Sequence, residues 1–291
     1  MVPQIKNGVL NINKPQGITS HDVVDIIRKI FPNTKVGHTG TLDPLATGVL
    51  PICIGKATKL SDELLSDNKK YEVKMLLGVE TDTYDITGKI VFANTLNNDE
   101  IYIKERIKRF IGKSSQIPPI YSAIKIKGKK AYEYARNGES VKLKPRDIEI
   151  FGIDDIDVNL KKRQVSFIVS CSKGTYIRSL VHDIGVKLGC GATMIELKRL
   201  KTGNFDIDDS IDLYDFLNLE YLEMLDRITS IENLYKDSKK VDLNEKDYEK
   251  FLNGIIINTD IQNGIVRVYE NLRYKGLGKI TDNSLKRFII E

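Results

Sequence analysis

One stretch of the chain gathers the residue types that catalysis needs. Residues 37–48 read Gly-His-Thr-Gly-Thr-Leu-Asp-Pro-Leu-Ala-Thr-Gly, so three glycines and three threonines surround a single acid, Asp43. Because Pro44 disfavours a helical conformation in the residue before it, we expect Asp43 to be extended and its carboxylate to point in one direction. Such a carboxylate suits a nucleophile or a general base, and the same spacing also suits an acid that caps a turn or the next helix.

Other familiar catalytic motifs are absent from the sequence. The Gly-Lys string at 55–56 lacks the preceding glycine and the following hydroxyl residue that a phosphate-binding P-loop requires. The sequence contains no GxSxG motif, and its three histidines and three cysteines show no metal-binding spacing. Nucleotide-dependent, serine-hydrolase and zinc chemistry are therefore disfavoured, and we expect no metal.

The elements around the loop predict an α+β fold. Alternating apolar residues before Pro15 predict a strand, and apolar residues at helical spacing after Thr19 or Ser20 predict a helix. Further strands are expected over 71–79, 147–153, 164–171 and 193–200, and helices over 99–111 and 175–188. Because strands and helices follow no regular βαβ rhythm, an α+β arrangement is favoured over a doubly wound sheet.

The chain length predicts two domains. At about 150 residues per domain, 291 residues make two, and a polar segment after Tyr235 suggests the boundary. We therefore expect a larger domain over 1–235 and a small β-rich domain over 236–291. The acidic stretch 210–227 is interpreted as one amphipathic helix capped by Ser210.

The net charge of +5 hides two segments of opposite sign. Residues 102–146 hold 13 basic and three acidic side chains, whereas residues 204–226 hold eight acids and no Lys or Arg. The basic segment is interleaved with aromatic residues, so it suits a phosphate backbone with rings for the bases; it also suits a solvated helix face. No apolar run is long enough for a membrane helix and the N-terminus lacks a signal-peptide core, so we expect no membrane and a cytoplasmic protein.

The loop and the motifs that follow it resemble those of the bacterial tRNA pseudouridine synthase B (TruB) family. The loop 37–48 carries the resemblance together with Asn13-Lys14-Pro15-x-Gly17-x-Thr19-Ser20 upstream of it. Further matches follow in the family's order: Lys70-Tyr71-Glu72-Val73, QIPPIYSA at 116–123, KGTYIRSL at 173–180, Leu197-Lys198-Arg199 and, near the end, Val266-Arg267-Val268-Tyr269. The resemblance runs from about Gly8 to the C-terminus.

The resemblance implies a fold, an activity and a partner. The fold would be a catalytic domain with a mixed, mostly antiparallel sheet flanked by helices, followed by a small RNA-binding domain of the PUA type. The activity would be isomerisation of uridine-55 in the T loop of tRNA to pseudouridine: the base is flipped out, detached and rejoined through carbon, without a cofactor. A monomer would hold the T arm, with residues 102–146 as an inserted basic arm, and the PUA-like domain would meet the acceptor stem.

The resemblance also implies roles for individual residues. Asp43 matches the catalytic aspartate, by a covalent or an acid–base route that the sequence leaves open, and Arg178 matches its arginine partner. Tyr71 matches the tyrosine that stacks on the target base, although a core strand residue is the alternative from its context.

Four more residues are implied in substrate binding or in shaping the site. Leu197 would cover the other face of the base, and Tyr176 would shape the pocket. His38 would contact the T loop, with a purely structural histidine as its alternative, and Lys14 would brace the catalytic loop. Two alternatives of function stay open: a related guide-RNA-dependent synthase, and an RNA-binding or tRNA-folding chaperone.

Overall fold

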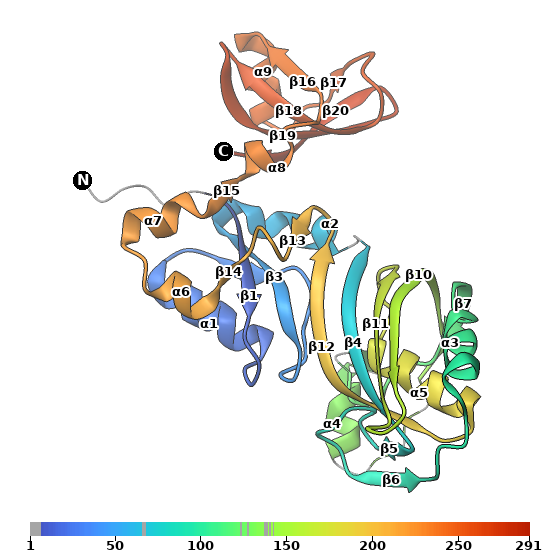
Figure 1. Ribbon diagram of the computed structural model, residues 1–291. Helices are drawn as coiled ribbons and strands as arrows, with labels where there is room; N and C mark the ends of the chain where they lie inside the picture. Colours follow the sequence, from blue (N-terminus) through green and yellow to red (C-terminus); the bar gives the residue numbers. More distant parts are fainter. Residues whose placement is uncertain are drawn as a thin grey trace.

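The computed structural model describes residues 7–65, 68–122, 124–126, 128–136, 139, 141 and 143–291. These residues form an 11-stranded sheet, a separate five-stranded sheet near the C-terminus and two short hairpins (Figure 1). The hairpins are β5–β6 (Val79–Thr81, Ile90–Ala93) and β8–β9 (Lys125–Ile126, Lys129–Lys130).

The 11-stranded sheet carries the loop 37–48, which contains Asp43. Its central path runs β14-β1-β3-β12-β4-β11-β10-β7, while β2, β13 and β15 pair at its sides. Only β1–β14 and β3–β12 are parallel among its strand pairs in the described residues, which confirms the mixed, mostly antiparallel sheet. The strands are β1 (Gly8–Lys14), β2 (Val36–His38), β3 (Thr47–Ile54), β4 (Lys69–Leu77), β7 (Gly112–Gln116), β10 (Arg146–Asn159), β11 (Gln164–Cys171), β12 (Ala192–Thr202), β13 (Phe205–Asp206), β14 (Ile211–Asp212) and β15 (Ile228–Ser230).

Helices flank this sheet, as expected for the α+β class. Helix α1 begins with a capping box in which Thr19 and Asp22 satisfy each other's backbone N–H groups. Helices α3 and α5 pack against the β4–β10 half, and α6 lies beside β1 (Figure 1). The helices of this part are α1 (Ser20–Ile30), the 3-10 helix η1 (Gly55–Leu60), α2 (Ser61–Leu65), α3 (Glu100–Lys108), α4 (Ala131–Arg136), α5 (Ile177–Leu188), α6 (Leu213–Leu217), α7 (Tyr221–Asp226) and α8 (Ile231–Leu234).

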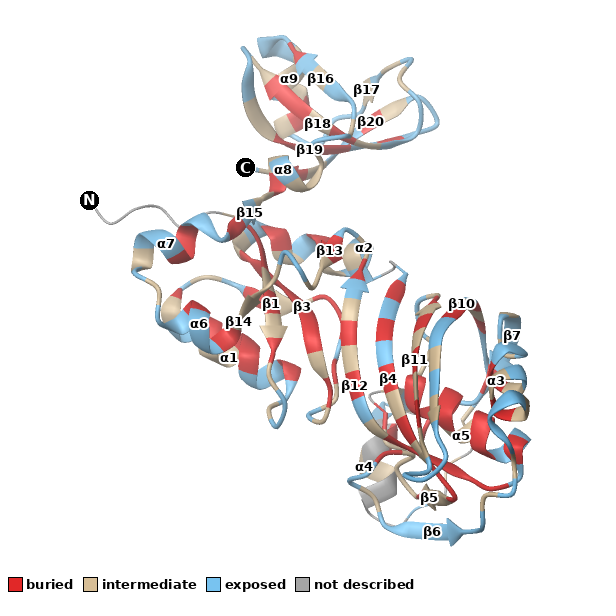
Figure 2. Cartoon of the chain, viewed as in Figure 1, coloured by how far each residue is buried: buried red, intermediate tan, exposed pale blue. Residues whose placement is uncertain are grey.

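The two halves of the large sheet are buried differently (Figure 2). Nearly every residue of β3 is buried, whereas residues of β4 and β11 alternate between buried and more exposed positions. Because successive side chains of a strand point to opposite faces, one face of the β4–β11 half packs on the core and the other is open. Tyr71 of β4 lies on the buried face.

The predicted single helix over 210–227 is wrong. This stretch forms the short strand β14 and two separate helices, α6 and α7. Asp212 caps α6 and Glu220 caps α7 through a capping box, so the acids end and restart helices instead of lining one. Ile211 pairs with Ile12 of β1, which draws the start of the segment into the sheet.

The basic segment 102–146 is partly built into this fold. Its first part contributes α3 and β7, and β7 pairs with β10. In the sequence, residues 117–145 connect β7 to β10, and they include the β8–β9 hairpin and α4. Lys127, Lys142 and the side chains of Lys130 and Arg136 lie outside what the structure describes.

The C-terminal residues form the β-rich unit. Its strands pair in the order β16-β18-β19-β20-β17. Leu277 and Ile289 of this unit join Val9 and Val49 of the large sheet in one buried cluster, and Tyr269 donates a 2.6 Å hydrogen bond to Glu232. No helix in the described part of the chain is long and apolar enough to span a membrane. The elements are β16 (Lys240–Leu243), α9 (Glu245–Leu252), β17 (Ile257–Asn258), β18 (Gly264–Glu270), β19 (Arg273–Thr281) and β20 (Ser284–Ile290).

Candidate active site

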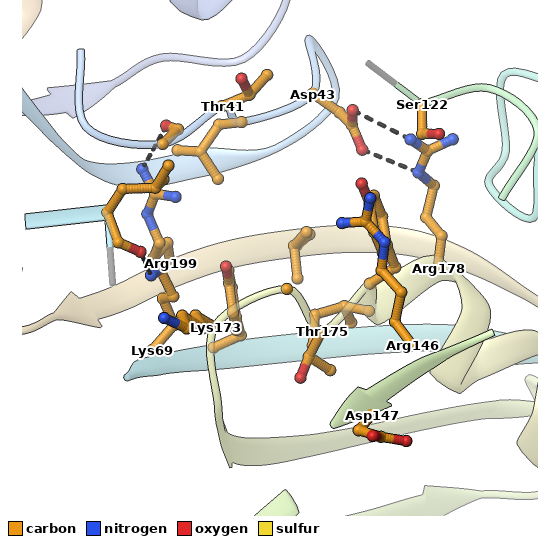
Figure 3. Close-up of a pocket in the computed structure, with 18 residues that line it drawn as sticks. Thr41, Asp43, Lys69, Ser122, Arg146, Asp147, Lys173, Thr175, Arg178 and Arg199 are labelled. Carbon is orange, nitrogen blue, oxygen red and sulfur yellow. Dashed lines mark hydrogen bonds and ion pairs between the residues drawn. The ribbon is translucent and has the colours of Figure 1, made fainter. Parts of the chain in front are cut away.

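A cavity of about 600 Å³ opens where the loop 37–48 meets β4, β12 and the start of α5. Five of the seven predicted site residues line it, and they come from four separate segments of the chain. These residues are Asp43, Tyr71, Tyr176, Arg178 and Leu197. The fold therefore brings together residues up to 154 positions apart in the sequence (Figure 3).

Asp43 and Arg178 form a two-point ion pair (Figure 3). The Arg178 Nε lies 2.9 Å from Oδ2 of Asp43, and its Nη2 donates to Oδ1 at 3.2 Å. Burial raises the pKa of Asp43, and Arg178 acts in the opposite direction by favouring the charged carboxylate. The fork of the guanidinium also fixes the orientation of the carboxylate, as the predicted role requires.

Arg178 meets a second carboxylate, Asp85, which the sequence analysis missed. The Asp85 Oδ2 lies 3.6 Å from Nη1 of Arg178, and both side chains are 7% exposed. Backbone carbonyls of Thr83 and Tyr121 accept further bonds from Arg178 at 3.2 and 2.9 Å. The other Asp85 oxygen accepts from the hydroxyls of Thr83 and Thr87. The only sequence signal was two acids among threonines at 81–87, which is equally typical of a turn.

Backbone contacts brace the loop that carries Asp43. The Ser20 hydroxyl donates to the Leu42 carbonyl at 3.0 Å and accepts from the Leu42 N–H at 2.8 Å. At Gly48 the strand β3 runs so close to β12 that a Cβ would lie 2.2 Å from the Arg199 carbonyl oxygen. Since Gly48 also has φ +101°, only glycine fits there without strain.

Two buried cations complete the bracing. Arg199 is 1% exposed and donates to the carbonyls of Val49 at 2.7 Å and Gly40 at 3.2 Å. Lys14 is fully buried, and its Nζ donates to the carbonyls of Pro15 and Ile18, both at 2.8 Å. Burial lowers the pKa of Lys14 to about 8, although nearby Asp43 favours its charge. Arg199 belongs to a quoted motif, but its burial among carbonyls has no sequence signal.

Apolar and aromatic groups form the walls of the cavity. Tyr71 and Leu197 are each 8% exposed and lie on the adjacent strands β4 and β12. Burial raises the pKa of Tyr71, so its phenol is neutral at pH 7. Tyr176 precedes α5, and the Gln116 amide holds its backbone by accepting from its N–H at 2.8 Å and donating to its carbonyl at 3.1 Å. Such walls suit a flat ring held between apolar faces.

His38 and Lys14 do not line the cavity among the described residues. The Gly40 N–H donates to Nδ1 of His38 at 3.3 Å, so this histidine contacts its own loop. Burial lowers the pKa of His38, which favours the neutral ring. Lys14 acts at a distance from the cavity through the backbone before α1.

A stacked pair supports the turn behind Arg178. Tyr84 has φ +64°, an unfavourable conformation for an aromatic residue, and its ring stacks on His182 at 4.0 Å and 15°. The His182 Nδ1 lies 3.2 Å from a carboxylate oxygen of Glu80. Tyr84 lies between Thr83 and Asp85, which both contact Arg178, so the stack holds the turn that receives the guanidinium.

The site combines a charge-paired carboxylate with a cavity shaped for a ring. Among the described residues, no three His, Cys, Asp or Glu side chains gather to hold a metal ion. One oriented carboxylate can attack a substrate or remove a proton, and the walls can hold a planar group against it. The fold and the site thus place one charge-paired carboxylate in a cavity whose walls suit a planar ring, an arrangement typical of an enzyme.

Comparison with known proteins assigns the chain to a family. Residues 28–177 match the N-terminal domain of TruB family pseudouridylate synthases, and residues 178–234 match the tRNA pseudouridylate synthase B C-terminal domain. The tRNA pseudouridine synthase B of Clostridium tetani is 46% identical over 96% of this chain and 98% of its own. That of Thermosipho melanesiensis is 48% identical over 85% of this chain and 79% of its own. The chain therefore belongs to the TruB family of pseudouridylate synthases, which confirms the predicted resemblance and enzyme class.

Solved structures agree with this assignment. A Cbf5-Nop10-Gar1 complex contains a chain that matches with a TM-score of 0.70 and 29% identity, over 98% of this chain and 84% of that one. An H/ACA RNP bound to a substrate RNA containing 2′-deoxyuridine matches with a TM-score of 0.69 and 27% identity, over 99% and 84% of the two chains. The α+β fold is thus shared with chains of these two assemblies.

Proposed function

We propose that the protein converts uridine-55 in the T loop of tRNA to pseudouridine, with Asp43 as the catalytic residue. The observation that most directly supports this proposal is the two-point ion pair between Asp43 and Arg178, inside a cavity lined by Tyr71 and Leu197. Asp43 lies inside the cavity, out of reach of a uridine that is stacked within a folded T loop, so the base has to be flipped into the cavity.

The residues of the cavity divide the work. Tyr71 and Leu197 hold the two faces of the uracil ring while it is detached and turned. Asp43 either attacks the nucleotide or removes a proton from the ribose; both routes need the ionised carboxylate, which Arg178 favours. The glycosidic bond from N1 to C1′ breaks, the ring rotates and C5 bonds to C1′ of the ribose. The C5 proton leaves to solvent, and N1 takes up a proton from solvent. Atoms balance without a cofactor because the product is an isomer of the substrate.

The remaining parts of the chain bind the rest of the tRNA. The basic segment 102–146 is proposed to lie along the T arm, and the β-rich unit at 236–291 is proposed as a PUA-like domain that meets the acceptor stem. His38 is proposed to contact the T loop. A monomer in the cytoplasm, where tRNA is available, is sufficient for this activity.

The guide-RNA-dependent alternative rests on weaker similarity. The matched chains of H/ACA assemblies are 27–29% identical to this chain, whereas tRNA pseudouridine synthase B of Clostridium tetani is 46% identical over nearly the whole length. An RNA-binding chaperone would not need the charge-paired acid in the cavity. A stand-alone synthase acting on tRNA is therefore the proposal that fits both observations.

Nucleotide-resolution mapping of pseudouridine tests this function. Unmodified tRNA transcript is incubated with the purified protein alone, treated with a carbodiimide that marks pseudouridine, and read by reverse transcription. We expect one new stop, at the T-loop uridine, without any added guide RNA. Absence of pseudouridine, or its formation only with a guide RNA, would contradict the proposal.

A further inference from the structure

Cationic side chains outnumber acidic side chains in the lining of the cavity. Five cationic and two acidic side chains line the cavity in the described residues: Lys69, Arg146, Lys173, Arg178 and Arg199 against Asp43 and Asp147. Arg178 is committed to Asp43 and Asp85, and Arg199 to backbone carbonyls. Lys69 donates to the Leu65 carbonyl. The excess charge at the mouth therefore falls on Arg146 and Lys173.

The guanidinium of Arg146 faces the cavity and is not engaged by any carboxylate of the described residues. It is the first residue of β10 and is solvent-exposed, and in Figure 3 its side chain points to the side of the cavity where Asp43 and Arg178 lie. Within the described ranges no residue forms an ion pair or side-chain hydrogen bond with it. Asp147, the next residue, lies away from that guanidinium in the same view, as alternation along a strand requires.

The backbone around Arg146 is held in place, although its side chain is exposed. Arg146 pairs in the sheet with Gln116 of β7, and the buried side-chain amide of Gln116 forms two hydrogen bonds with the backbone of Tyr176. The turn before α5 is tied to the same strand, since the Glu149 N–H donates to the Ser172 hydroxyl and the Ser172 N–H to the Glu149 carbonyl. Gly174 at the apex of this turn has φ +80° and open space around it. Arg146 and Lys173 thus sit on one rigid rim.

We propose that Arg146, assisted by Lys173, binds a phosphodiester next to the flipped uridine. This inference rests on the proposed function. With the base between Tyr71 and Leu197 and the ribose at Asp43, the backbone phosphates of that nucleotide must lie at the mouth of the cavity. The exposed guanidinium of Arg146 presents a planar fork that matches a phosphate, and neither carboxylate of the lining forms an ion pair with it. Arg146 would fix the sugar against Asp43 by holding the strand on both sides of the reacting atoms.

The proposal is tested by pairing Arg146→Gln with RNA that lacks one phosphate charge. T-arm stem-loops carry a neutral methylphosphonate either 5′ or 3′ of the target uridine, and a third stem-loop is unmodified. On unmodified RNA we expect R146Q to weaken binding about tenfold, the loss of one charged hydrogen-bonded contact, and to flatten the log–log salt slope by about 0.7–0.9. On one of the two methylphosphonate RNAs, wild type and R146Q should bind equally.

Controls separate this contact from general charge and from folding. Arg227→Gln removes another exposed arginine, at the end of α7. It should change the affinity by less than about twofold and the log–log salt slope by less than about 0.3. The melting temperature of R146Q should equal that of wild type because Arg146 is exposed. Unchanged binding by R146Q, or an equal loss on all three RNAs, would overturn the proposal. Failure of the wild-type protein to form pseudouridine in the unmodified stem-loop would instead count against the proposed function.

Discussion

Two buried arginines stand on opposite sides of the cavity and have different partners. Arg178 meets two carboxylates, Asp43 and Asp85, besides backbone carbonyls. Arg199 contacts the Gly40 carbonyl of the loop 37–48, the Val49 carbonyl of β3 and the Tyr71 hydroxyl. Two side chains of the same type thus have different partners: Arg178 pairs with carboxylates, and Arg199 mainly holds the backbone.

We therefore expect Arg178 to adjust the pKa of Asp43 and Arg199 to stabilise the backbone of the loop. Removing Arg178 changes the charge balance around Asp43, so its effect should appear in the pH dependence of catalysis. Removing Arg199 frees the loop backbone, so its effect should appear mainly in stability. The predictions below are built to separate these two kinds of effect.

The largest effect is expected for Arg178→Gln. This change leaves Asp43 and Asp85 without their cation, and we expect kcat/KM to fall about 10³-fold or more and stability by about 3–5 kcal/mol. Burial already raises the pKa of Asp43, and loss of Arg178 raises it further. Activity needs the ionised acid, so the acidic limb of the kcat/KM profile should move to higher pH. Single-turnover assays from pH 5 to 9 measure it.

Arg178→Lys is the matched control for this variant. It keeps the charge but loses the two-point fork, so the acidic limb should stay nearer to that of wild type while the rate remains reduced. An unchanged pH profile in R178Q would show that Arg178 does not tune Asp43.

A smaller loss of activity is expected for Arg199→Met. The Val49 and Gly40 carbonyls lose their donor in a buried place, which should cost about 3 kcal/mol of unfolding free energy. The rate should fall about 10- to 100-fold because Asp43 is less well positioned, with the acidic limb of the pH profile unmoved. Urea denaturation and the same assays test this. A shifted acidic limb in R199M would erase the distinction between the two arginines.

Loss of the stack between Tyr84 and His182 should reduce activity moderately. His182→Ala removes the ring that supports Tyr84 in its left-handed conformation, and we expect kcat to fall about fivefold with stability lower by about 1–2 kcal/mol. KM should change little because His182 does not line the cavity. His182→Phe keeps a ring there and should restore kcat. If the alanine and phenylalanine variants behave alike, the stack does not position the turn.

The smallest effect concerns the pH dependence of stability through Lys14. Its pKa in the fold, about 8, is below the value of an unfolded lysine, so the unfolded chain binds the proton more tightly between about pH 8 and 10. Lys14 should therefore make the wild type gain stability as pH rises through that window. The stability difference between wild type and Lys14→Met, measured by urea unfolding at pH 7.5 and 9.5, should move in favour of wild type. A constant difference would contradict the buried, charged Lys14.

Much of the site was predictable because its residues sit in recognisable local motifs. Asp43, Tyr71, Arg178 and Leu197 converge on one cavity, as expected. Asp85 and Arg199 were missed for a physical reason: their roles arise only from contacts between distant segments. Arg146 belonged to a counted basic segment, yet only the pairing of β10 with β7 places it at the cavity.

The fold was predictable where apolar periodicity is strong. The strands at β1, β4 and β11 and the helices α1 and α5 follow their patterns. The stretch 210–227 failed because an acid can either line a helix or cap one, and Asp212 and Glu220 do the latter. Pairing of Ile211 with β1 is a tertiary contact that no local pattern reports.

Replacement of the single acid in the loop tests the central claim most directly. Tritium release from T-arm RNA labelled at C5 of uridine is measured for wild type and Asp43→Asn, together with the affinity for the same RNA. We expect D43N to bind the RNA within about threefold of wild type and to release no tritium above background, because the isosteric amide can neither attack nor remove a proton. Release by D43N at a rate near that of wild type would contradict the account.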